Sequence, residues 1–176
     1  MKKVIVVLGM LLLILTSCGK EKKERIEDKS KLEIRNEKFY VIGENKPYTG
    51  TFISKHENGN LWEEEKYKDG LHHGEFKTYF TNGQLILLNV YKDGNLDGPH
   101  KAYYENGNLR IEGTYKNGNL EGILRMYYEN GQLWSESIYE NDEEMTPTKW
   151  YDENGNPKPS LEEIERNGLW KKLYQY

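Results

Sequence analysis

The sequence predicts a mainly β protein, in which repeated β-hairpins stack into an elongated, twisted antiparallel meander sheet. Two observations predict this class. Asn-Gly pairs recur every 24 residues, at 58–59, 82–83, 106–107, 130–131 and 154–155. A second series of turn-forming pairs keeps the same spacing, at 69–70, 93–94 and 117–118. A fixed period of this length is typical of an array built from one small supersecondary unit.

The segments between these pairs have the properties of strands. Asn-Gly and Asp-Gly favour two-residue hairpin turns, in which both central residues need φ > 0. In the third repeat, Leu109, Ile111 and Tyr115 share one parity, so period-2 geometry puts them on one face. The tyrosines at 67, 91, 115 and 139 and the glycines at 50, 74, 98 and 122 form further columns. A single hairpin cannot bury its apolar face alone, so stacking must supply the stability.

The first 17 residues have the pattern of an export signal. Lys2 and Lys3 precede an apolar run at 4–15, which is too short to span a bilayer. Residues 15–18 then read Leu-Thr-Ser-Cys, which resembles the bacterial lipobox. That resemblance implies cleavage before Cys18 and diacylation of its thiol, so Cys18 is the expected site of lipid attachment and membrane anchoring.

Three further segments complete the expected organisation. Residues 18–38 should form the lipidated cysteine and a flexible charged tether, because 19–38 is rich in charge and has no aromatic residue. Residues 39–158 should form the repeat domain. It should open on a hairpin that pairs 38–42 with 47–50. Residues 159–176 should form a short capping helix and a tail, since Ser160 and Glu163 resemble a capping box.

Composition limits the function classes. Residues 39–176 hold 15 basic and 23 acidic side chains, a net charge of −8 that suits neither nucleic acid nor anionic headgroups. The single cysteine excludes an intramolecular disulfide and a cysteine-based metal cluster.

No catalytic residue, metal or cofactor is expected. His72 and His73 read as solvated turn histidines, since no metal-binding partners converge with them. Glu63 and Glu65 share a strand face, but a catalytic carboxylate pair has no further support.

One aromatic column is the candidate partner-binding site. Its members, Tyr79, Tyr103, Tyr127 and Tyr151, are opposite in parity to Phe80, Tyr104 and Tyr128. If one face packs the core, the other presents this stripe, and exposed aromatic ladders suit protein, peptide or glycan binding. The alternative is that both faces gain from cross-strand aromatic packing without any ligand.

The repeated unit resembles a known family. The pattern G-x-F/L-x-x-Y-Y/F-x-N-G-x-L, followed by Y-K-D/N-G-x-L, is similar to the MORN repeat in its bacterial variant form and covers residues 48–156. The resemblance extends to YwqK-like proteins, described as antitoxins, and to membrane-associated MORN scaffolds. An export signal departs from the antitoxin pattern, because an exported protein cannot easily neutralise a cytoplasmic toxin.

Together these features predict a non-enzymatic lipoprotein in the bacterial cell envelope that binds a protein partner as an interaction or scaffold module. One alternative is an immunity or antitoxin protein that neutralises a toxin partner. A third, from another class, is an envelope hydrolase acting on glycans.

Overall fold

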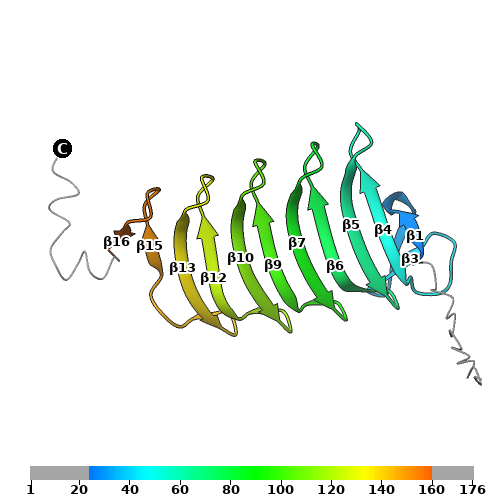
Figure 1. Ribbon diagram of the computed structural model, residues 1–176. Coiled ribbons are helices and arrows are strands. Elements are labelled where there is room, and N and C mark those ends of the chain that lie inside the picture. Colours follow the sequence, from blue (N-terminus) through cyan, green and yellow to red (C-terminus); the bar gives the residue numbers. More distant parts are fainter. Residues whose placement is uncertain (1–23, 160–176) are drawn as a thin grey trace, which may run out of the picture.

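The computed structural model describes residues 24–159 and confirms a mainly β fold of stacked hairpins. Successive hairpins form one long, curved, single-layer sheet (Figure 1). Its main strands, in spatial and sequence order, are β4 (Gly50–Lys55), β5 (Leu61–Lys68), β6 (Leu71–Tyr79), β7 (Leu85–Lys92), β9 (Gly98–Tyr103), β10 (Leu109–Lys116), β12 (Gly122–Tyr127), β13 (Leu133–Glu140), β15 (Lys149–Tyr151) and β16 (Pro157–Lys158).

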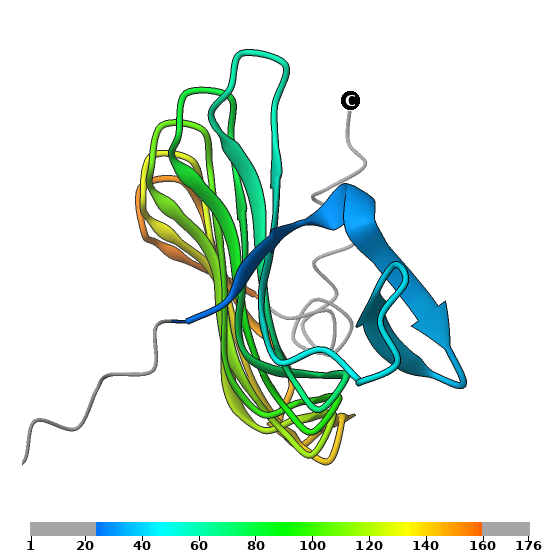
Figure 2. The same cartoon turned by 90° about the vertical axis from the view of Figure 1, so that its right-hand side faces the viewer.

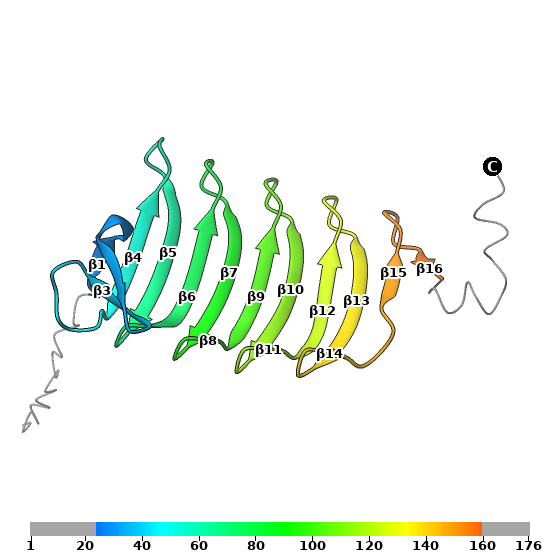
Figure 3. The same ribbon diagram turned by 180° about the vertical axis from the view of Figure 1, so that it is seen from behind.

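Short strands line one rim of the sheet, where the chain passes from one hairpin to the next (Figure 3). They are β8 (Asn95–Leu96), β11 (Asn119–Leu120) and β14 (Glu143–Glu144). Beside each, a glycine or aspartate N–H donates to a carbonyl one repeat earlier: Gly94 to His72 (2.9 Å), Gly118 to Leu96 (2.7 Å) and Asp142 to Leu120 (3.1 Å). The repeats are therefore joined through the backbone at the 24-residue spacing.

The two turn series have different geometries. At Asp69-Gly70 both central residues have positive φ (51° and 79°), which confirms the predicted two-residue turn. At Asn58-Gly59 only the glycine does (87°), so the same prediction is wrong for the Asn-Gly series. There the Asn58 side chain accepts a hydrogen bond from the Asn60 N–H (3.0 Å), which forms a longer Asx-type loop. A one-residue bulge follows, between Ser54 and Lys55.

Cross-strand pairing sorts the side chains onto two faces, because directly paired residues point the same way. One row reads Ser54, Glu63, Thr78, Leu87, Ala102, Ile111, Met126, Ser135 and Trp150. The opposite row reads Ile53, Glu64, Lys77, Leu88, Lys101, Glu112, Arg125, Glu136 and Lys149. The first row lies on the concave face, which carries the N-terminal hairpin (Figure 2), and the second lies on the convex face.

The expected flexible tether is wrong for the part of it that the structure describes. Residues 24–38 contribute β1 (Ile26–Asp28), a 3-10 turn (Lys29–Lys31) and β2 (Leu32–Arg35). β1 pairs in parallel with β4 and covers the first edge of the sheet. Charge density suggested disorder, but backbone pairing and ion pairs hold the segment.

The initial hairpin also differs from the prediction. β3 (Lys38–Val41) pairs with β2, and not with residues 47–50, so these two strands form a separate two-stranded sheet. The turn between them places Asn36 and Glu37 at φ of 48° and 61°. This hairpin packs on the concave face over the first repeat, where Val41, Tyr48, Phe52 and Tyr67 form a buried cluster.

The remaining predicted segments lie outside the described residues. They are the signal peptide at 1–17, Cys18 and the capping helix within 159–176. The 24-residue register persists to the last described turn, where the Gly155 N–H donates to Asp152 (2.9 Å).

The repeats are also joined by side chains, which generates a stability prediction. The Tyr128 hydroxyl donates to the Tyr151 carbonyl (2.9 Å), as Tyr104 does to Tyr127 (2.7 Å). We expect Tyr128→Phe to lower the free energy of unfolding by about 1 kcal/mol, the net value of one hydrogen bond. Phe80 holds the equivalent position without a hydroxyl, so Phe80→Tyr should raise it by up to about 1 kcal/mol. Urea unfolding measures the free energy of unfolding of both variants. If neither variant differed from the original protein, these hydroxyl–carbonyl bonds would not contribute to stability.

Candidate functional site: two faces of one sheet

The convex face carries a lattice of alternating charge. Arg125 lies between Glu112 and Glu136, with nitrogen–oxygen distances of 3.6 Å and 2.8 Å. Lys149 approaches Glu136 from the next strand at 3.8 Å. Near the other end, Glu75 accepts from Lys77 (2.6 Å). Such half-exposed pairs contribute little stability but give the face a fixed pattern of charge for a partner to match.

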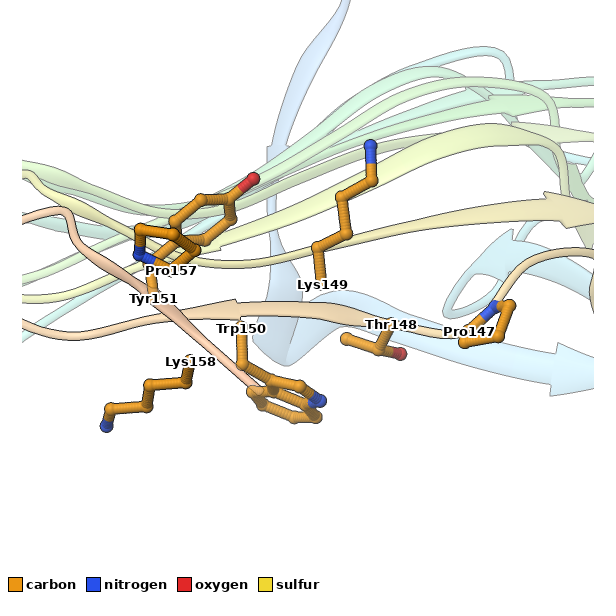
Figure 4. A pocket seen from close by; sticks show the side chains of 7 residues that line it. All are labelled: Pro147, Thr148, Lys149, Trp150, Tyr151, Pro157 and Lys158. Atoms are coloured by element: carbon orange, nitrogen blue, oxygen red, sulfur yellow. The ribbon is translucent and has the colours of Figure 1, made fainter. Parts of the chain in front are cut away.

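The predicted partner-binding tyrosines lie along this charged face and are half-buried. The Tyr127 hydroxyl donates to Glu112 (2.7 Å), and burial together with this bond raises the pKa of Tyr127 to about 12. Burial, with nearby Glu64, also raises the pKa of Tyr79. Tyr151 points away from Trp150 to the side of Lys149 (Figure 4). The column is therefore accessible but held in place by its neighbours.

Exposed aliphatic side chains adjoin the same column. Ile123 and Ile138 are paired across β12 and β13, and are 42% and 41% exposed. With Tyr127 and Arg125 they form a mixed patch, hereafter the convex patch. Tyr and Arg in a partly apolar setting are typical of protein–protein interfaces.

The concave face differs in chemistry. From β7 to β13 its central row is neutral, and Ala102 and Ser135 are almost fully buried in the curve. Nearer the rim, the second tyrosine column pairs with the glycine column: Gly50 with Tyr67, Gly74 with Tyr91, Gly98 with Tyr115, and Gly122 with Tyr139. We call this line of alternating residues the tyrosine–glycine row.

The N-terminal end of the concave face is closed by a polar cluster. Lys29 reaches from the 3-10 turn to Glu63 (2.5 Å) and Glu65. Tyr67 donates to the second oxygen of Glu65, which is 3% exposed. Burial, with Glu65, raises the pKa of Tyr67. The two glutamates predicted to share a face do so, and both are ion-paired to Lys29, which fastens the hairpin to the sheet.

His72 is not the solvated turn residue that the sequence predicted. It lies in β6, with ring-centroid distances of 4.4 Å to Tyr67, 5.0 Å to Phe39 and 5.0 Å to Tyr91. This position could not be predicted from the sequence, because the aromatic neighbours of His72 come from three different elements. Burial lowers the pKa of His72, and the Glu65 carboxylate 3.8 Å away opposes that shift only in part. His73 is more exposed and pairs with Asp93 (3.1 Å).

Other kinds of site have no counterpart in the described residues. Within 24–159, no three His, Cys, Asp or Glu side chains converge as a metal site. No helix in this range is long and apolar enough to cross a bilayer.

A shallow hollow of about 300 Å³ lies at the C-terminal end, between Pro147, Trp150 and Pro157 (Figure 4).

The geometry defines a class: a single-layer hairpin-repeat protein with two accessible faces. The comparison with protein families is specific. The family model for the MORN repeat variant matches residues 48–69, 73–93, 96–117 and 120–141. The chain is therefore a MORN-variant repeat protein with four matched repeats. No curated protein matches the chain. MORN repeats are generally protein- or membrane-binding modules and are not enzymatic in general.

Sequence reasoning missed the elements that close the N-terminal end. Lys29 and Phe39 both contact the first repeat, but Lys29 lies in the segment predicted to be flexible. The sequence does contain a pattern that predicts this hairpin. Leu32 and Ile34 are two residues apart, as are Phe39 and Val41, and a short polar turn separates the two pairs, as expected for two strands joined by a turn.

The buried histidine generates a pH prediction. In the unfolded chain the pKa of His72 is about 6.5, and in the folded chain burial lowers it. The folded state therefore resists protonation, so stability is complete above about pH 6.5 and falls as the pH drops. Leucine occupies the equivalent positions 96 and 120, so the test variant is His72→Leu. This variant should lose less folding stability than the original protein between pH 7 and pH 5.5. Unfolding midpoints at several pH values measure this; equal losses in both proteins would contradict it.

Proposed function

We propose that this protein is a non-enzymatic, membrane-anchored interaction module of the bacterial cell envelope, and that it binds a folded protein partner through its convex face. The observation that carries the proposal is the convex patch, where exposed Ile123 and Ile138 adjoin Tyr127 and Arg125 in a lattice of charges. A broad sheet face of this composition suits another protein surface.

Charge fixes the kind of partner surface. Positive and negative side chains alternate across the strands, so a partner needs an alternating pattern of its own to match them. Because these charges are at least partly solvent-exposed, binding at this face should weaken as the salt concentration rises.

The anchor is the second part of the proposal. Cys18 is the only cysteine in the chain and stands at the lipobox position. A diacylated Cys18 would hold the protein at a membrane, because two or more acyl chains anchor stably. Export follows from the basic and apolar pattern of residues 1–15.

Two alternatives remain. Immunity or antitoxin activity is a special case of partner binding, and the resemblance to YwqK-like proteins favours it. A glycan hydrolase is a different class, and its candidate catalytic residues are the Glu63–Glu65 pair. Both glutamates bind Lys29, and this pairing disfavours a catalytic role.

A partner-capture experiment tests the convex site. The full-length protein is crosslinked in envelope preparations of its source cell, and the captured proteins are identified by mass spectrometry. We expect one reproducible protein partner, and a Tyr103→Ser/Tyr127→Ser variant should lose at least tenfold in recovery because interface tyrosines often contribute more than 1 kcal/mol each.

The control is a Tyr115→Ser/Tyr139→Ser variant, matched in residue type and repeats but altered on the concave face. It should retain capture of the partner that the Tyr103→Ser/Tyr127→Ser variant loses. Loss of capture in this control alone would place the partner on the other face and overturn the proposal. A secreted toxin among the partners would support the immunity alternative, and recovery of glycan without protein would support the hydrolase.

Lipidation is tested separately. Cys18→Ala should abolish labelling of the protein by a radiolabelled or alkyne-tagged palmitate and should release it from the membrane fraction. Labelling that persists in Cys18→Ala would refute the anchor.

A further inference from the structure

The tyrosine–glycine row presents half-buried aromatic rings, of which Tyr91 packs beside His72 (5.0 Å) and Tyr115 beside His100 (5.7 Å). On one side each tyrosine is paired with a glycine, which has no side chain to cover the ring. On the other side its partner is a residue of a short rim strand: Leu96 for Tyr91, Leu120 for Tyr115 and Glu144 for Tyr139. Tyr91, Tyr115 and Tyr139 are half-buried, and in the part of the chain that the structure describes, the N-terminal hairpin lies only at the β4 end of the sheet (Figure 3). The hairpin therefore leaves three positions of the row uncovered.

The first position shows what the row accepts. The protein's own Phe39 packs on Tyr67 at a ring-centroid distance of 4.7 Å and on His72 at 5.0 Å. Beside it, Pro47 lies against the turn at Gly70, where an added Cβ would come within 2.9 Å of the Pro47 Cβ. The open positions continue this occupied interface along the stacking axis.

The spacing of the row selects the backbone conformation of an occupant. Each repeat adds two strands of about 4.8 Å, so Tyr91 and Tyr139 are separated by about 19 Å along the stacking axis. A polyproline II segment turns once in three residues and about 9.3 Å, so six residues cover about 19 Å with the same side facing the row. Two heptads of an α-helix cover about 21 Å. In a β-strand, side chains on one face recur at about 6.6 Å or 13 Å, which fits less well.

Hydrogen-bonding capacity selects the same occupant. A polyproline II segment has no internal hydrogen bonds, so its carbonyls need outside donors. Among residues 24–159, no atom accepts a hydrogen bond from the Tyr115 or Tyr139 hydroxyl. These two hydroxyls are therefore available as donors, while the rings offer packing surface for proline.

The surroundings of the row suit an uncharged ligand at Tyr91 and Tyr115, whose rim-strand partners are Leu96 and Leu120, whereas Tyr139 is paired with Glu144. The neighbouring central row is neutral from Leu87 to Trp150. Trp134 and Trp150 lie 5.6 Å apart at its C-terminal end and are 39% and 36% exposed. Proline-rich segments bind in aromatic-lined grooves because their conformation is preformed and costs little entropy.

We infer that the concave tyrosine–glycine row, over Tyr91, Tyr115 and Tyr139, is a binding site for a proline-rich protein segment in the polyproline II conformation. The segment runs across the strands, with one turn of three residues for each 24-residue repeat. The site is separate from the convex patch, so each proposal stands or fails without the other.

Direct binding to the full-length protein in detergent tests the inference. The probe is a fluorescently labelled twelve-residue oligoproline, measured by anisotropy against a Gly-Ser peptide of equal length and an amphipathic helical peptide with apolar residues every seven positions. We expect the oligoproline to bind saturably and the two other peptides not to do so. Its affinity should depend only weakly on the salt concentration, and a three-residue oligoproline should bind at least tenfold more weakly.

Variants locate the site. Tyr115→Ala/Tyr139→Ala should weaken oligoproline binding at least tenfold, and Tyr115→Phe/Tyr139→Phe, which keeps the rings and removes the donors, should weaken it by a smaller factor. Tyr103→Ala/Tyr127→Ala on the convex face should leave it unchanged. Absence of saturable oligoproline binding, equal or tighter binding of the helical peptide, or equal loss in the convex variant would overturn the inference.

Discussion

Backbone hydrogen bonds between consecutive repeats are the constraint on which the rest of the structure depends. A single layer of hairpins has little interior, and the buried aromatic side chains of residues 24–159 gather at the N-terminal end, at Tyr48, Phe52 and Tyr67. Beyond that end, each hairpin is held by the strands on either side and by bonds such as Gly118 N–H to Leu96. Every column of side chains exists because these bonds repeat at an unchanged interval.

The constant 24-residue interval keeps chemically different side chains on the two faces of the sheet. Because side chains alternate along a strand, one continuous register keeps charged residues such as Arg125 on the convex face and neutral ones such as Ile111 on the concave face. An insertion of one residue would exchange the faces beyond it. In residues 24–159, extra residues recur as bulges beside the Asn-Gly loops of four successive hairpins. A further register shift lies between β5 and β6, at Glu65 and Tyr67.

The edge strands of a repeat sheet must be protected, because the unpaired backbone groups of an exposed edge can hydrogen-bond with another chain. Here β1 covers the first edge in parallel, and the β2–β3 hairpin follows it onto the concave face, held by Lys29 and Phe39. The same segment therefore protects the edge and occupies the first position of the tyrosine–glycine row.

Much of this architecture could be predicted from the sequence because the repeats are local and periodic. The Asp-Gly turns, the strand parity and the two tyrosine columns all follow from 24-residue spacing and period 2. The N-terminal cap could not, because its contacts join residues far apart in the chain, such as Lys29 with Glu65, in a segment whose charge suggested disorder. The burial of His72 was missed for the same reason, since Phe39 reaches it from outside the repeat. Both tyrosine columns were predicted from the sequence, one of them, at 79, 103, 127 and 151, as the candidate partner site, but only the structure assigns each column to the concave or convex side.

Removal of one repeat in register tests the account most directly. Deletion of residues 98–121 removes 24 residues and joins Asp97 to Gly122, which preserves an acidic residue before glycine. The shortened protein should fold, show β-sheet circular dichroism and unfold cooperatively at a lower urea concentration. Deletion of residues 98–120, one residue fewer, should abolish cooperative unfolding because every later side chain changes face. Equal behaviour of the two deletions would contradict the claim that the 24-residue register holds the protein together.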